Sequence, residues 1–146
     1  MFTQLLKERD SLPKPIFPQS LNGTSATTGP LDMSLFSRCQ LIGSVGALGA
    51  SGNTAAYLQE SNEANGANAT NVSGGAIVNI ASSNGAFTIE VNATQLTKRY
   101  VQGVIGVSTT ASLVCGFLVG TEGRYPPVNN NDNSTFVVQR IVTPNP

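Results

Sequence analysis

The chain has few side chains that could carry out chemistry. It contains no His among its 146 residues, which excludes a Ser-His-Asp triad, a Cys-His pair and a His-ligated metal. Cys39 and Cys115 therefore lack a base that would activate either thiol as a nucleophile. Both lie within apolar segments, so we interpret them as buried thiols that act as small hydrophobic residues, with one disulfide as the alternative.

Paired carboxylates are the second candidate chemistry. Glu60 and Glu63 lie close together in the sequence, and two carboxylates can work as acid and base where their surroundings separate the two pKa values. Glu60 ends an expected strand, and Glu63 lies in the polar loop 61–66. We therefore interpret both as solvated loop charges.

Three further motifs fall short of a binding site. The glycine-rich stretch 46–53 lacks the Lys-Ser/Thr end of a phosphate loop. The oxygen-rich stretch 129–133 has Asp132 as its only carboxylate, fewer than a calcium loop needs. The basic pair Lys98 and Arg99 allows a phosphate contact, but a solvated strand edge or an inter-subunit ion pair is the simpler interpretation. We predict no catalytic, cofactor-binding or metal-binding residues, no cofactor and no enzymatic activity.

The charge balance limits the partners. Eight basic and eight acidic residues give a formal net charge of zero, and only 11% of residues are charged. A nucleic-acid partner is not expected, because phosphate neutralisation needs a cationic face. A membrane partner is not expected either, since no apolar run approaches the length of a span. Leu5 and Leu6 are followed at once by four charges, unlike a secretion signal, so we expect synthesis in the cytoplasm.

Short runs of alternating apolar and polar residues predict the elements that must carry any site. Seven strands are expected, at 36–45, 54–60, 75–80, 86–92, 98–107, 112–119 and 135–142. This pattern predicts an all-β fold, an antiparallel β-sandwich or jelly-roll-like barrel. Hairpins are predicted at the Asn-Gly turn within 82–85 and at 108–111. The expected core residues are Ile77, Ile80, Phe87, Ile89, Val91, Tyr100, Val104, Leu113, Cys115 and Phe117.

The first 34 residues differ from this pattern. They contain four of the eight Pro residues and no core-forming period, so an extended N-terminal arm is expected over 1–34, before a β-sandwich domain with a C-terminal extension over 35–146. Such an arm can bind a neighbouring surface through backbone and apolar contacts. The expected capsid or subunit contacts are Leu5, Leu6, Ile16 and Phe17 in the arm, and Phe136 and Val138 in the C-terminal extension.

An ordered series of motifs carries a family resemblance over roughly residues 40–127. A Leu-Gln-Glu-Ser strand at 58–61 precedes a polar loop, then comes a Lys-Arg-Tyr-Val strand at 98–101 and a last return to Gly123–Pro126. The order and spacing of these motifs resemble small structural proteins of tailed bacteriophages, specifically capsid decoration or cement proteins. The Pro-rich arm and the extension from Val128 to Pro146 depart from that pattern.

The resemblance implies a virion structural protein that forms a homotrimer and binds the major capsid protein. It would lie on the outer capsid surface of an icosahedral head, assembled in the host cytoplasm, and stabilise junctions between capsid subunits. An alternative is a tail or baseplate β-sandwich that binds carbohydrate or a host surface. The alternative is disfavoured because the chain has no Trp and only three Tyr, whereas sugar sites use exposed aromatic residues.

Overall fold

The computed structural model describes residues 9–49, 52–80 and 84–124, with only the backbone of 77–79. The described residues form nine strands and one short 3-10 helix, η1 (Ala93–Gln95). The strands are β1 (Lys14–Leu21), β2 (Thr24–Thr27), β3 (Leu31–Asp32), β4 (Phe36–Val45), β5 (Asn53–Ser61), β6 (Thr70–Ile80), β7 (Gly85–Asn92), β8 (Tyr100–Ser108) and β9 (Ser112–Gly123). The prediction of an all-β fold is confirmed.

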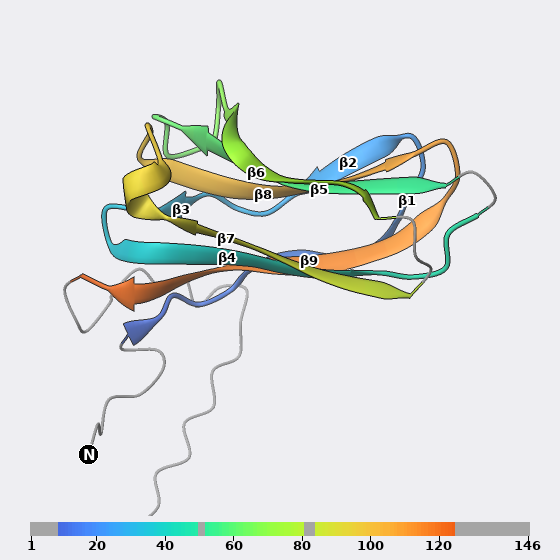
Figure 1. Ribbon diagram of the computed structural model, residues 1–146, viewed down its shortest axis with the longest axis horizontal. Coiled ribbons are helices and arrows are strands. Elements are labelled where there is room, and N and C mark those ends of the chain that lie inside the picture. Colours follow the sequence, from blue (N-terminus) through green and yellow to red (C-terminus); the bar gives the residue numbers. More distant parts are fainter. Residues whose placement is uncertain (1–8, 50–51, 81–83, 125–146) are drawn as a thin grey trace, which may run out of the picture.

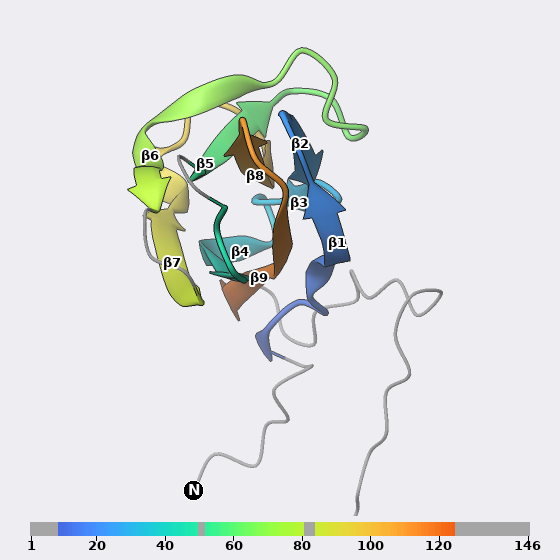
Figure 2. The same cartoon turned by 90° about the vertical axis from the view of Figure 1, so that its right-hand side faces the viewer.

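The strands form two antiparallel sheets that face each other (Figures 1 and 2). Sheet A has the order β1-β9-β4-β7, and sheet B has the order β2-β8-β5-β6, with β3 also paired to β8. Side chains that alternate inward from both sheets meet between them and form one core. The molecule is therefore the expected β-sandwich. Six of the seven expected strands correspond to β4–β9, the strand expected at 135–142 lies outside the described residues, and β1–β3 are additional strands.

The strand order is that of a jelly roll. Strand β5 pairs with its sequence neighbour β6, and around that hairpin β4 pairs with β7, β2 and β3 pair with β8, and β1 pairs with β9. Each successive pair encloses the one before it, as when a long hairpin is rolled into a sandwich. The first and last described strands consequently lie side by side.

The two hairpins predicted from turn signals are wrong. Strands β6 and β7 belong to different sheets, and so do β8 and β9. Asn84 does adopt the positive φ, 58°, that an Asn-Gly turn uses, and its N–H donates to the carbonyl of Gly46 at 3.1 Å. The local turn preference is thus satisfied, but the chain crosses between sheets because β7 and β9 pair with β4 instead.

The Pro-rich segment is part of the sandwich rather than a separate arm. Residues 14–32 supply β1, β2 and β3, which pair with β9 and β8 of the same chain. Ile16, Leu21 and Leu31 are buried in the core, so these side chains anchor the segment. The prolines in β1 fit this place, because an edge strand tolerates residues without an N–H.

Large core side chains fit because glycines face them. A Cβ added at Gly120 would lie 2.6 Å from the Phe36 ring, and one added at Gly103 would lie 2.5 Å from Leu41. Phe36 and Leu41 are fully buried.

The core prediction is confirmed in part. Of the expected core residues, Phe87, Ile89, Val91 and Val104 are buried, Ile80, Tyr100 and Cys115 are half-buried, Leu113 and Phe117 are exposed, and the Ile77 side chain lies outside the described part.

Gly120→Ala should destabilise the fold, because the new methyl group overlaps the Phe36 ring and the core must shift. We expect a loss of about 1–3 kcal/mol, measured by equilibrium urea unfolding. Gly106→Ala is the matched control in β8, where the nearest atom to a new Cβ is Ser25 Cβ at 3.6 Å. Equal stability of the two variants would contradict this account of the core.

Candidate functional site

The outer face of sheet A carries an exposed apolar cluster. Phe17 on β1 and Leu113 on β9 are 61% and 62% exposed, and Phe117 on β9 is 41% exposed. These are the large hydrophobic side chains that the described part of the chain leaves exposed, and we call these three residues the apolar cluster. Exposed apolar side chains that lie together commonly mark an interaction site.

Strand register explains why the three residues lie together. Side chains alternate along β9, so Leu113 and Phe117 point outward while Val114 and Leu118 are buried. Next to β9, the register of β1 shifts between Ile16 and Gln19. This bulge places Phe17 beside the stretch of β9 between Leu113 and Phe117. The cluster therefore spans two paired strands over about 14 Å.

The two cysteines lie on opposite faces of sheet A and are both free. Cys39 is fully buried in the core, and burial, with a smaller contribution from the charge of Glu90, raises the pKa of its thiol to about 12. Cys115 is half-buried beside the apolar cluster, and its Sγ lies 3.2 Å from Ser44 Oγ. The intrachain disulfide is thus excluded, and only Cys39 is the fully buried thiol that the sequence predicts.

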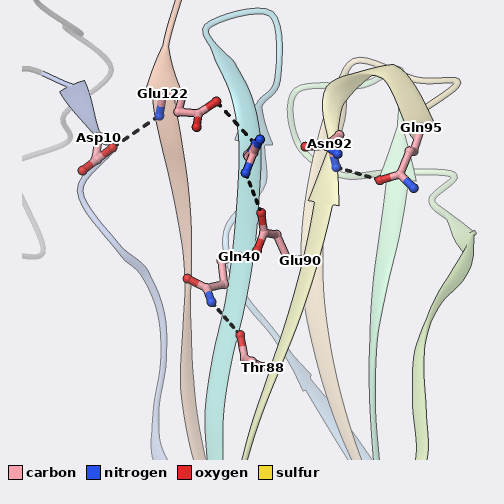
Figure 3. A network of polar contacts seen from close by, with 8 residues as sticks. Asp10, Gln40, Thr88, Glu90, Asn92, Gln95 and Glu122 are labelled. Atoms are coloured by element: carbon pink, nitrogen blue, oxygen red, sulfur yellow. Dashed lines mark hydrogen bonds and ion pairs between the residues drawn. The ribbon is translucent and has the colours of Figure 1, made fainter.

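The other end of the same face is polar (Figure 3). Arg38 on β4 lies 3.5 Å from a Glu90 carboxylate oxygen and 3.4 Å from a Glu122 carboxylate oxygen. Gln40 donates to the Thr88 hydroxyl at 2.8 Å. Such exposed contacts add little stability. Their effect is to place one cation between two carboxylates, so that the face has one apolar end and one charged, polar end.

Glu60 has a structural role at the end of β5, and its interpretation as a solvated loop charge is wrong. Its side chain is buried, and its carboxylate accepts hydrogen bonds from the Thr97 N–H at 2.7 Å, the Thr97 hydroxyl at 2.6 Å and the Lys98 N–H at 3.1 Å. Burial alone would raise the pKa of Glu60, but these hydrogen bonds outweigh it and hold the pKa below its ordinary value. Glu63 does lie exposed in the loop, where it accepts from Asn68 at 2.7 Å.

The two central motifs of the family resemblance lie side by side where Glu60 and Ser61 pair with Val101 and Tyr100. Residues 58–61 of β5 run beside 100–103 of β8, and Glu60 joins them to the segment before β8. Arg99 donates to both carboxylate oxygens of Asp32, at 2.6 and 3.0 Å. Lys98 Nζ donates to the Thr70 hydroxyl at 2.9 Å. The basic pair therefore connects the start of β8 to β3 and β6 of its own chain, and the Asp32 carboxylate occupies Arg99.

A hollow of about 660 Å³ lies on the outer face of sheet B. It is open, and its lining combines the hydroxyl side chains of Thr24, Ser25, Ser108 and Thr109 with Asn53, Val107 and small residues. No aromatic side chain lines it. The hollow lacks the aromatic platform and the carboxylates that a sugar site usually combines.

The sequence-predicted contact residues have different places in the structure. Phe17 is exposed in the apolar cluster, whereas Ile16 is 3% exposed and belongs to the chain's own core. The sequence pattern predicts Leu113 and Phe117 in the core, and this prediction is wrong because apolar residues on both faces of β9 conceal the alternation. The unusually apolar run 111–120 was the signal that could have revealed them. Leu5, Leu6, Phe136, Val138 and the stretch 129–133 lie outside the described residues.

Comparisons with known proteins assign no family to the chain. No protein-family model matches it, and no curated protein matches it. Among the described residues, no group of three or more His, Cys, Asp or Glu side chains is placed to hold a metal ion. The same residues include no helix that is long and apolar enough to cross a membrane.

Glu60→Gln should lower stability at neutral pH, because the amide cannot replace a carboxylate that accepts three hydrogen bonds. We expect a loss of about 1–3 kcal/mol at pH 7. Since the folded pKa of Glu60 is lowered, its contribution is present above the ordinary carboxyl pKa and disappears as the pH falls through the folded value. Urea unfolding between pH 3 and pH 7 measures this difference.

The control for this measurement is Glu63→Gln, which changes an exposed carboxylate in the neighbouring loop. Its stability should follow that of the unchanged protein at every pH. A Glu60→Gln loss that stays constant across the pH range would contradict the assigned role of the Glu60 charge.

Proposed function

We propose that this chain is a virion structural protein, a capsid decoration protein that binds the outside of an icosahedral phage head. It binds the major capsid protein through the apolar cluster and stabilises subunit junctions mechanically. The observation that carries this proposal is the exposure of Phe17, Leu113 and Phe117 together on one face. The family resemblance of the sequence motifs supplies the identity of the partner.

The distribution of charge supports a binding function rather than catalysis. The apolar cluster itself consists of uncharged side chains, and at the other end of the face Arg38 pairs with Glu90 and Glu122. A surface of this kind can approach another protein without the cost of burying an unpaired charge. We propose no enzymatic activity and no cofactor for the chain.

Repetition strengthens this mode of binding. Decoration proteins of the family that the sequence resembles often form trimers, and we propose a homotrimer on the particle. Several copies of one modest apolar contact, held in fixed geometry, bind far more tightly than one copy does. The apolar cluster therefore needs only a small area per copy.

A head-binding assay tests the proposal. Purified protein is added to expanded phage heads that lack it, and bound protein is measured by co-sedimentation. Leu113→Ser with Phe117→Ser should reduce binding at least tenfold, because both substitutions remove exposed apolar contacts without opening the core. Ser44→Ala, on the same face, is the control and should bind like the unchanged protein.

Two results would contradict this function. Either the unchanged protein does not bind expanded heads, or the double variant binds as tightly as the control while both remain folded. Circular dichroism and urea unfolding establish that the variants are folded.

The alternative, carbohydrate binding on a tail or baseplate, would use the polar hollow on sheet B. The observation that favours carbohydrate binding is that the hydroxyl groups of Thr24, Ser25 and Ser108 line the hollow. Binding on a glycan array that Ser25→Trp abolishes, together with no affinity for heads, would support the alternative over capsid decoration.

A further inference from the structure

Strand β7 is a long, regular sheet edge with no protective feature in its sequence. Within the described residues it pairs with β4 alone, in unbroken register from Arg38↔Asn92 to Val45↔Gly85. Its eight residues include no Pro and no Lys, the residues that commonly protect an edge. A strand of this kind presents a row of backbone donors and acceptors that can pair with another strand.

The other three sheet edges are protected, which makes β7 different. At the opposite edge of sheet A (Figure 2), β1 contains Pro15 and Pro18 and a register shift. In sheet B, one edge is divided into the short strands β2 and β3. The other edge, β6, has two register shifts against β5 and a positive φ of 74° at Gly74.

The core is least well covered beside β7. Phe87 and Ile89 are 9% and 8% exposed, the highest values in the core cluster. Both point inward from β7. A strand added along β7 would cover these side chains and satisfy the free backbone groups of the edge in a single step.

We propose that the β7 edge pairs with β7 of a second copy, antiparallel and about a two-fold axis at Ile89. This register places Phe87 opposite Val91 of the second copy on the inner face. On the outer face it places Thr88 opposite Glu90 and Ala86 opposite Asn92. The two sheets A then become one continuous sheet. The contact uses the edge opposite the apolar cluster, so it is independent of the proposed function.

The residue pattern of β7 fits a second copy of the same strand as the occupant. Glu90 is the only charged residue in β7, and in the proposed register the two Glu90 side chains do not oppose each other. Each faces a neutral Thr88, and each also has Arg38 of its own chain as a partner at 3.5 Å. Like charges directly opposite each other would destabilise a strand pair, and this register avoids them. The chain's zero net charge adds no general repulsion between copies.

Two variants at one position test the register. Thr88→Glu would oppose a carboxylate to Glu90 of the second copy, twice in each pair, whereas Thr88→Lys would oppose an ammonium group to it. Both variants remove the same Thr88 hydroxyl that accepts from Gln40, so they differ in the charge that they place at position 88. Association of the full chain is measured by sedimentation velocity over a range of concentrations at low salt.

The unchanged protein should form pairs, Thr88→Lys should retain them, and Thr88→Glu should raise the dissociation constant at least tenfold relative to Thr88→Lys. The gap between the variants should narrow in high salt, because screening weakens both charge effects. If the copies also associate through a second contact, the comparison still isolates the β7 contact, since only position 88 differs. The proposal is overturned if the unchanged protein is monomeric throughout, or if the two variants associate equally.

Discussion

Pairing between β1 and β9 is the contact on which the rest of the structure depends. It joins the first described strand to the last, and it encloses every other strand pair of the jelly roll. Ser11, just before β1, strengthens it, because its N–H donates to the Gly120 carbonyl at 2.8 Å and its hydroxyl accepts from the Gly120 N–H at 2.7 Å. Proteins closed by such non-local contacts fold slowly, because distant parts of the chain must meet before the contacts form.

The same strand pair builds the surface that we assign to binding. On the inner side it seats Ile16 in the core, and on the outer side it sets Phe17 beside the exposed side chains of β9. Sheet A is therefore apolar on both faces along β9, which an isolated sandwich does not need. The β1–β9 pair thus contributes both to stability and to the proposed capsid contact. A substitution in it affects capsid binding without affecting stability only at outward-facing positions such as Leu113 and Phe117.

The sequence predicted the fold class because alternation of apolar and polar residues depends only on local spacing. Strand β4 was predicted with its exact bounds for this reason. The nesting of strands was not predictable, since the turn signals near Asn84 and at 108–111 describe the local backbone but not which strand becomes the partner. The Pro-rich segment was misassigned for a related reason: Ile16, Leu21 and Leu31 reach the core only because β8 and β9 lie beside them. The prediction of Leu113 and Phe117 in the core is wrong because burial depends on which side of β9 faces the other sheet. The spacing of residues in the sequence does not show which side that is.

Cryo-electron microscopy of the intact particle that carries this protein tests the central claim most directly, because it shows which face of the sandwich meets the shell. We predict density for the jelly roll on the outer surface of the head, with Phe17, Leu113 and Phe117 against the major capsid protein. A particle in which this face of sheet A points to solvent, or one in which the protein is absent from the head, would contradict the account.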